Sequence, residues 1–202
     1  MCLSTGRTTM NNDRHERLFF ALALESPTNQ PAFRQLCQLI QILPGDGRRV
    51  PDSNLHLTLA FLGLVSEQQK EHLLALTSAL TLPAFSLHAS ILKYQKRSRL
   101  IWLGCNNVPA PLEQLAADLK EAAEQVGLKQ ERRKYTPHIT LKKHVRQRPE
   151  SLPENNDFTF HFQHFGLYIS EQVKTARRSG VRYRCLQQWP LSQTKPDNQD
   201  PE

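Results

Sequence analysis

NLHLTLAFLG, residues 54–63, has the alternation of a β-strand but carries two polar side chains within it. Successive side chains of a strand point to opposite faces, so Leu55, Leu57 and Leu59 share one face while His56 and Thr58 share the other. The leucine face is typical of a strand that packs on a hydrophobic core. The imidazole and the hydroxyl on the opposite face therefore need a separate explanation.

The same four-residue pattern, His-apolar-Thr-apolar, recurs at residues 138–141 as HITL. With eight histidines, 12 threonines and an apolar fraction of 39%, about 0.07 occurrences are expected by chance, and two are present. The two histidines lie 82 positions apart, which is about half of the expected folded core. This spacing predicts two related lobes, each contributing one motif strand.

The remainder of the chain predicts alternating strands and helices with short connections. Helices are expected at residues 31–43, 66–80 and 109–127, and the second opens with the capping-box pattern Ser66-x-x-Gln69. Strands other than the two motif strands are expected at 17–24, 85–94, 99–104, 158–170 and 180–191. The fold class predicted from this order is α+β.

Composition limits the classes of protein that are compatible with the chain. A length of 202 residues and a charged fraction of 22% fit a globular protein, with residues 17–192 as one bilobal domain, 1–16 as a disordered lead-in and 193–202 as a flexible tail. Translation could start at Met1 or at Met10.

The net charge of +7 suits an anionic partner. Four cysteines without metal-binding spacing favour a reducing, cytoplasmic location, and no apolar run could cross a membrane.

Two His-Thr pairs suggest chemistry at phosphorus. If the two motif strands meet across a groove, one imidazole can be neutral and the other protonated near neutral pH. One could then deprotonate water while the other protonates a departing oxygen, and the threonine hydroxyls could donate to phosphate oxygens. No metal or other cofactor is expected.

Paired motifs at this distance resemble the signature of the 2H phosphoesterase superfamily. RLFFALAL, NLHLTLAFLG, RLIWLG and PHITL, in this order, resemble its bacterial and archaeal branch, the RNA 2′,3′-cyclic phosphodiesterases once called 2′-5′ RNA ligases. The resemblance implies a bilobal fold, with two antiparallel-rich sheets flanking a central groove and helices outside. It also implies hydrolysis of RNA 2′,3′-cyclic phosphate ends to 2′-phosphomonoesters, and in vitro the joining of tRNA halves by 2′,5′ linkages.

The resemblance assigns roles to four residues of this chain. It implies that His56 is the proton donor, His138 the proton acceptor, and Thr58 and Thr140 the phosphate ligands. Reversing the reaction exchanges the acid and the base. We further expect a monomer.

Further substrate contacts are expected from charged and aromatic residues near the second motif. Arg133 and Tyr135 precede that motif closely enough to reach a groove, and the resemblance implies that an aromatic ring there can stack on the terminal base. Tyr183 is a weaker candidate for the same role. Other candidates for contact with the RNA backbone are Arg97, Arg99, Arg132 and Lys134.

The motifs leave several alternatives open. Within enzymes, the substrate could be a small cyclic nucleotide or a nucleotide-sugar cyclic phosphate, and ligation could replace hydrolysis. A non-catalytic RNA or nucleotide binder could also keep such a groove, although arginine would serve binding alone better than histidine. If the motifs are coincidental in a basic α+β domain, His56 and His138 should lie far apart in space.

Overall fold

The computed structural model describes residues 15–154, 156–174 and 179–192. The tail expected at 193–202, most of the lead-in expected at 1–16, and the choice between Met1 and Met10 lie outside these residues. Glu16, which the sequence analysis placed in the lead-in, is the first residue of strand β1.

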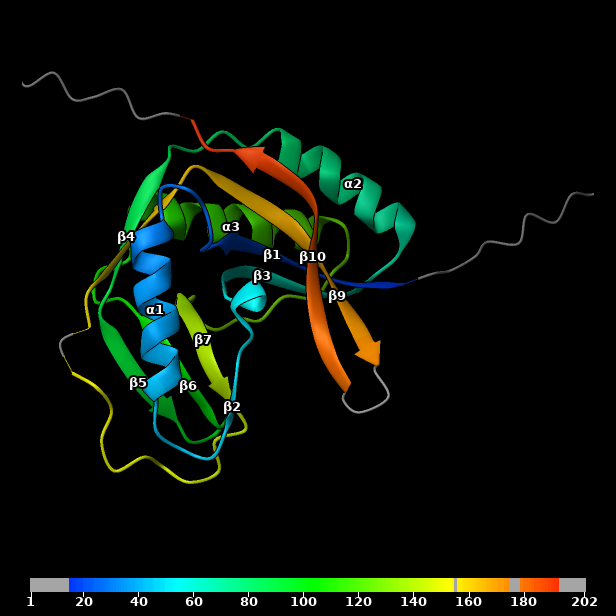
Figure 1. Cartoon of the computed structure of the whole chain (residues 1–202). Coiled ribbons are helices and arrows are strands. Elements are labelled where there is room, and N and C mark those ends of the chain that lie inside the picture. Colours follow the sequence, from blue (N-terminus) through cyan, green and yellow to red (C-terminus); the bar gives the residue numbers. More distant parts are fainter. Residues whose placement is uncertain (1–14, 155, 175–178, 193–202) are drawn as a thin grey trace, which may run out of the picture.

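The described residues contain more strand than helix, and three α-helices accompany the strands (Figure 1). The helices are α1 (Gln30–Ile42), α2 (Glu67–Ser78) and α3 (Ala110–Gln125), and a short 3-10 helix, η1, spans Asp52–Asn54. The strands are β1 (Glu16–Ala23), β2 (Arg48–Arg49), β3 (His56–Val65), β4 (Phe85–Ala89), β5 (Ile91–Gln95), β6 (Leu100–Gly104), β7 (His138–Lys143), β8 (Phe158–Phe162), β9 (His164–Lys174) and β10 (Ser179–Pro190).

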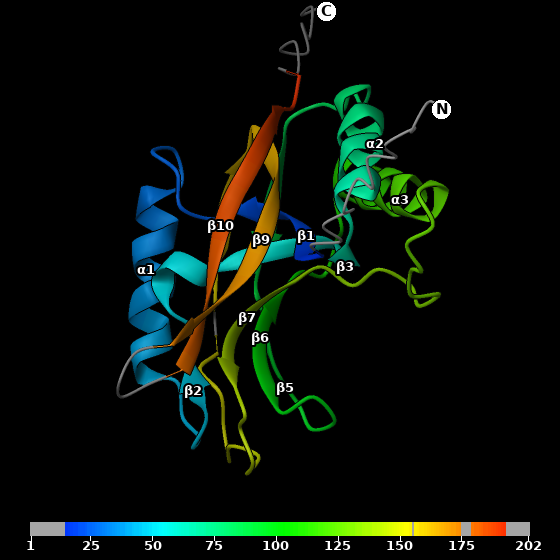
Figure 2. The ribbon, with the colours of Figure 1, turned by 90° about the vertical axis from the view of Figure 1, so that its right-hand side faces the viewer.

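The main sheet has the order β10-β9-β1-β3-β7-β6-β5, with β2 paired to β7. All of these pairings are antiparallel, which confirms the predicted α+β class. The two motif strands, β3 and β7, are neighbours at the centre, but a single residue pair, Leu57 with Ile139, joins them. The sheet therefore has two lobes that meet at this pair, each ending in one motif strand. Figures 1 and 2 show these strands running in different directions.

Two segments that we predicted as single strands are each divided between two sheets. The segment 85–94 breaks at Ser90 into β4 and β5, and the segment 158–170 breaks at Gln163 into β8 and β9. Strands β4 and β8 pair only with each other, whereas β5 and β9 belong to the main sheet. Both predictions of unbroken strands were wrong, because the two halves of each segment pair with different strands and the local sequence does not specify these partners.

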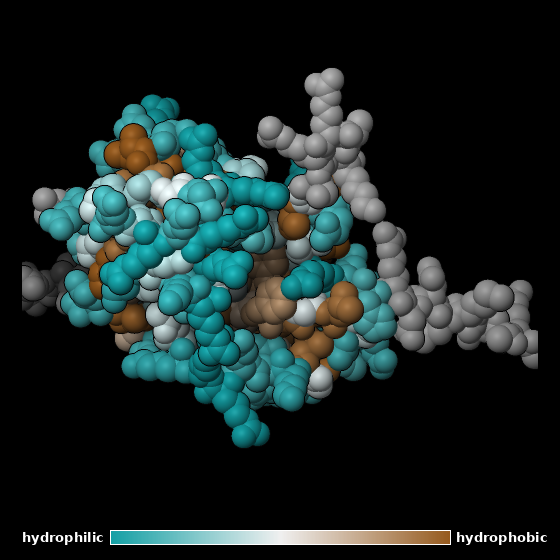
Figure 3. Space-filling view, turned by 90° about the horizontal axis from the view of Figure 1, so that it is seen from below, coloured by the Kyte–Doolittle hydropathy of each residue, from teal (hydrophilic) through white to brown (hydrophobic). Residues whose placement is uncertain are grey.

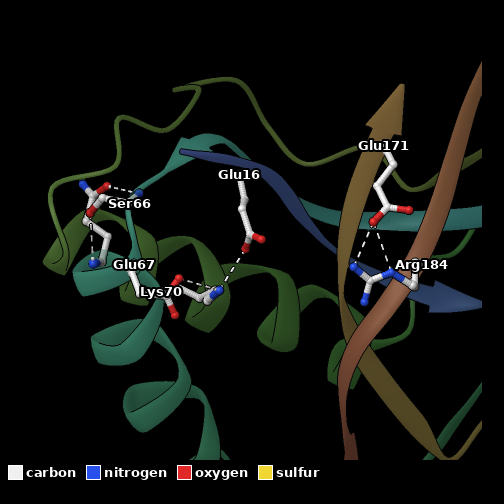
Figure 4. A network of polar contacts seen from close by, with 7 residues as sticks. Glu16, Ser66, Glu67, Lys70, Glu171 and Arg184 are labelled. Atoms are coloured by element: carbon white, nitrogen blue, oxygen red, sulfur yellow. Dashed lines mark hydrogen bonds and ion pairs between the residues drawn. The ribbon is translucent and has the colours of Figure 1, made fainter. Parts of the chain in front are cut away.

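The helices pack their apolar faces on this framework, and Figure 2 shows α1 at one side of the molecule with α2 and α3 at the other. The predicted capping box is confirmed, because Ser66 and Gln69 bond reciprocally at the start of α2. Lys70 in the first turns of α2 pairs with Glu16 of β1 at 2.9 Å, which ties the helix to the sheet (Figure 4). Figure 4 also shows the pair Glu171–Arg184 linking β9 to β10.

None of the helices in the described ranges is both long and apolar enough to cross a membrane.

Candidate active site

His56 is the first residue of β3, and its ring is held on several sides. Its Nδ1 lies 2.7 Å from the backbone carbonyl of Asn54. Because a carbonyl oxygen only accepts, Nδ1 carries the hydrogen and Nε2 is left with its lone pair, 3.1 Å from the Thr58 hydroxyl. The ring also contacts Phe19 and Tyr183, with centroids 5.1 Å away in both cases.

Hydrogen bonds of the Asn54 side chain fix the position of the carbonyl that accepts from His56. Asn54 is buried, its side-chain amide donates to the carbonyl of Val181 at 2.7 Å, and its side-chain oxygen accepts from the backbone N–H of Tyr183 at 3.2 Å. Strand β10 thus fixes the residue whose carbonyl orients the first histidine. The sequence analysis missed this role, because Asn54 and β10 are 127 residues apart.

His138 is the first residue of β7 and repeats the arrangement of His56. Its Nδ1 donates to the backbone carbonyl of Thr136, again two residues earlier, at 2.9 Å. Its ring contacts Trp102 of the neighbouring strand β6, with centroids 5.7 Å apart. In both motifs, therefore, Nδ1 is occupied by the backbone and Nε2 is the nitrogen available for chemistry.

The fold brings the two motifs together on one face. Leu57 and Ile139, the pair that joins β3 to β7, are fully buried. The residues that flank them point the other way, and these four side chains, His56, Thr58, His138 and Thr140, are half-buried. This placement excludes the interpretation in which the motifs are coincidental and far apart.

The environment of His56 favours the neutral imidazole. Burial, and to a lesser degree the nearby positive charges of Lys143 and His138, lower its pKa from 6.5 to about 4, although the Asn54 carbonyl acts in the opposite direction. In the free protein at neutral pH, Nε2 of His56 is therefore a proton acceptor. It can donate a proton only after an anion beside it has raised its proton affinity.

Lys143 joins the same face through an irregularity in the sheet. Between β6 and β7, Trp102 pairs with Thr140 and Ile101 pairs with Lys142, so Leu141 has no partner in the register. Leu141 and Lys142 are both buried in consequence, and Lys143 returns to the half-buried face of the motif. Strict alternation along HITLKK places Lys143 on the core face, which is why the sequence analysis did not select it.

A cavity of about 150 Å³ lies against His56. The rings of Phe19, Tyr168 and Tyr183 line it, together with the carboxylates of Glu25 and Asp52. Figure 3 shows a hollow in the surface seen from below, with brown, apolar residues among hydrophilic ones. A larger hollow, of about 670 Å³, lies between β5 and residues 148–156 and contains neither motif histidine.

The other expected contact residues are placed as follows. Tyr135 is largely buried, and its hydroxyl donates to the backbone carbonyl of Thr58 at 2.9 Å. Burial raises the pKa of this hydroxyl, so it remains a donor. Arg133 is exposed and pairs with the carboxylate of Glu131. The remaining basic candidates, Arg97, Arg99, Arg132 and Lys134, are exposed on loops. Tyr183, by contrast, contacts the His56 ring directly.

Within the described ranges, no three His, Cys, Asp or Glu side chains lie close enough together to hold a metal ion.

Two imidazoles on one face, each with Nδ1 bonded to a backbone carbonyl and Nε2 directed away from the backbone, define a site suited to acid–base catalysis. Comparison with known proteins places the chain in a family. The family model of the 2′-5′ RNA ligase superfamily matches residues 32–173. The RNA 2′,3′-cyclic phosphodiesterase of Escherichia coli K12 is 34% identical over 178 residues, which cover 88% of this chain and 98% of the relative. The protein of the same name from Thermotoga maritima is 31% identical over 172 residues, which cover 78% of this chain and 90% of the relative.

The solved structures agree with the sequence comparison. The crystal structure of E. coli LigT complexed with 3′-AMP superposes with a TM-score of 0.79 at 34% identity, and the match covers 89% of this chain and all of that one. This protein belongs to the 2′-5′ RNA ligase superfamily of two-histidine phosphoesterases.

Proposed function

We propose that this protein is an RNA 2′,3′-cyclic phosphodiesterase that opens the cyclic phosphate at an RNA 3′ end to a 2′-phosphomonoester. The observation that carries the proposal is the pair of Nε2 atoms presented on one face by β3 and β7. The E. coli and T. maritima relatives that bear this activity in their names support the choice of substrate.

In the proposed reaction, water attacks phosphorus and the P–O3′ bond breaks. His138 accepts the proton of the attacking water at Nε2, and His56 donates a proton from Nε2 to the departing O3′. The negative charge of the bound phosphate raises the pKa of His56 from its low value in the free protein. The imidazole then takes up a proton from solvent, and this is the proton that it donates.

The phosphate is held by neutral and cationic donors. Thr58 and Thr140 donate hydroxyl hydrogen bonds to the non-bridging oxygens, and Lys143 adds a positive charge on the same face. These side chains account for proton transfer and phosphate binding, so we propose that the reaction needs no metal. We also propose contact between Arg133 and the RNA backbone, with release from Glu131.

Other properties follow from the same proposal. We propose that the protein acts as a monomer in the cytoplasm and that tRNA halves with cyclic phosphate ends are among its substrates. We also propose that 2′,5′ ligation occurs in vitro when the 5′-hydroxyl of a second RNA attacks phosphorus in place of water and the P–O3′ bond breaks. For Tyr135 we propose support of the Thr58 backbone in place of stacking on a base, because its hydroxyl bonds to that backbone.

The test is hydrolysis of a short RNA ending in a 2′,3′-cyclic phosphate, in the presence of EDTA, with 2′- and 3′-phosphate products resolved. We expect the 2′-phosphate alone, and a rate lowered by roughly 10²- to 10⁴-fold in His56→Ala and in His138→Ala. His72→Ala, which changes an exposed histidine of α2, is the matched control and should retain full activity. A folded wild-type protein that gives no product would overturn the proposal, and retained RNA affinity in that case would identify a binder.

A further inference from the structure

The face of β3 that carries His56 continues beyond the motif. Two irregularities in the pairing with β1 leave Leu59 and Leu62 without partners, and both of these leucines are buried. Each irregularity shifts by one residue the alternation of side chains between the two faces of β3. Phe61 and Leu64 therefore lie on the same face as the motif residues. Phe61 and Leu64 are large apolar side chains with exposed fractions of 50% and 64%.

Arg17 of β1 covers part of Phe61. Its guanidinium carbon lies 5.0 Å from the centroid of the Phe61 ring, and its own strand partner is Leu64. Among the described residues, no carboxylate forms an ion pair with Arg17. An aromatic ring that is half-exposed beside an unpaired guanidinium combines the two groups that hold single-stranded nucleic acid, a stacking surface and a phosphate partner.

Phe61 is connected to the histidine site by an aromatic neighbour. Its pairing partner on β1 is Phe19, whose ring contacts both His56 and Tyr183. Paired residues of antiparallel strands share a face, so an apolar path runs from His56 past Phe19 to Phe61.

We propose that Phe61 and Arg17 form an outer subsite that stacks a base upstream of the 3′-terminal nucleotide. This inference rests on the proposed function and extends it, because it makes a single-stranded oligonucleotide a better substrate than a cyclic mononucleotide. Phe61 is five residues from His56, or roughly 15 Å along the strand, so a base stacked there belongs to a nucleotide before the reacting one. The cationic Arg17 favours an anionic strand over an apolar protein partner as the occupant.

The experiment compares kcat/KM for a mononucleotide 2′,3′-cyclic phosphate and for a tetranucleotide with the same 3′-terminal nucleotide and cyclic end. Phe61→Leu keeps apolar bulk but removes the π face, and we expect it to lower kcat/KM by about tenfold on the tetranucleotide only, as for the loss of one base–aromatic stack. Phe61→Trp should retain wild-type values. Arg17→Gln should lower kcat/KM on the tetranucleotide and weaken its dependence on salt.

Ile42→Ser is the matched control. Ile42 is the most exposed large apolar residue described, at 70%, and lies at the end of α1, away from the β3 face. This variant should leave both substrates unaffected, and unchanged melting temperatures should accompany every variant used.

Several outcomes would overturn the inference while leaving the proposed function intact. These are equal kcat/KM of the wild type on both substrates, no effect of Phe61→Leu on either substrate, and an equal loss on both. A wild-type protein inactive on both cyclic phosphates would instead overturn the proposed function, and this inference with it.

Discussion

At the scale of single residues, the site depends on the hydrogen bonds that two imidazoles donate to two backbone carbonyls. Asn54 and Thr136 each accept from Nδ1 of the histidine two positions later, at 2.7 and 2.9 Å. This bond selects the tautomer and orients the ring, which leaves Nε2 for the substrate. His56 is additionally enclosed by the rings of Phe19 and Tyr183, and this enclosure lowers its pKa.

The low pKa of His56 predicts a dependence of stability on pH. The unfolded chain binds a proton at this histidine near pH 6.5, whereas the folded chain binds it only near pH 4. The neutral His56 side chain therefore makes its full contribution to stability above pH 6.5, and this contribution is lost as the pH falls from there toward 4. Between pH 7 and 4.5, we expect the wild type to lose roughly 2–3 kcal/mol more than His56→Gln does. Urea denaturation at several pH values measures this, and parallel curves for the two proteins would contradict it.

Tyr135→Phe tests the positioning of Thr58. The change removes one hydrogen bond, from the tyrosine hydroxyl to the Thr58 carbonyl, and should lower the free energy of unfolding by about 1 kcal/mol. Because the ring stays in place, a role in stacking predicts unchanged kcat and KM, whereas support of the Thr58 backbone predicts a lower kcat. Steady-state kinetics on the cyclic-phosphate RNA distinguish the two, with Tyr94→Phe as a control hydroxyl bonded to the carbonyl of Val145.

At the scale of elements, β7 is positioned by a buried lysine. Lys142 is 5% exposed, and its ammonium donates to the carbonyls of Leu43, Pro44 and Gly45, at 3.2, 3.1 and 2.6 Å. These carbonyls follow the C-terminus of α1, so the lysine joins that helix to the strand that carries His138. Burial lowers the pKa of Lys142, but its three acceptors replace the water that a charged group requires.

Lys142→Met removes that connection. We expect a loss of about 2–4 kcal/mol in the free energy of unfolding, because the three carbonyls lose a charged donor, itself buried, that methionine cannot replace. Lys129→Met, at an exposed lysine after α3, should change stability by less than about 0.5 kcal/mol. Urea denaturation of both variants measures the difference, and similar losses in the two would show that the connection contributes little.

At the scale of the whole molecule, the two lobes meet where the site lies. The sheet is continuous from β10 to β5, but its halves are joined through one pair, Leu57 with Ile139, beside the four motif side chains. A ligand that bridges His56 and His138 would therefore contact both lobes at their junction.

Binding of a product nucleotide should accordingly stabilise the whole chain. At a concentration of 100 times Kd, a 2′-mononucleotide should add about 2.7 kcal/mol to the free energy of unfolding. For a chain of this length, each kcal/mol raises Tm by roughly 2–4 °C. Differential scanning calorimetry checks this, and the shift should vanish in the double variant Thr58→Ala, Thr140→Ala. An equal shift in that variant would place the ligand elsewhere.

The sequence by itself determined the local features of this protein. Each of these features is encoded in a short stretch of the chain: either copy of the His-apolar-Thr-apolar pattern, the alternation around Leu57, the capping box at Ser66 and the periodicity of α3. They were sufficient for the α+β class, for the choice of both motif histidines as candidates and for the family resemblance.

Only the tertiary structure decided which distant segments share a surface. The breaks at Ser90 and Gln163, the register shift that turns Lys143 toward the site, and the bond from Asn54 to β10 all depend on pairing between strands. Such pairing is selected by packing across the whole fold, and a single irregularity reverses the faces of every residue after it. For this reason the contact of Phe19 with His56 and the position of Phe61 on the same face were not visible in the sequence.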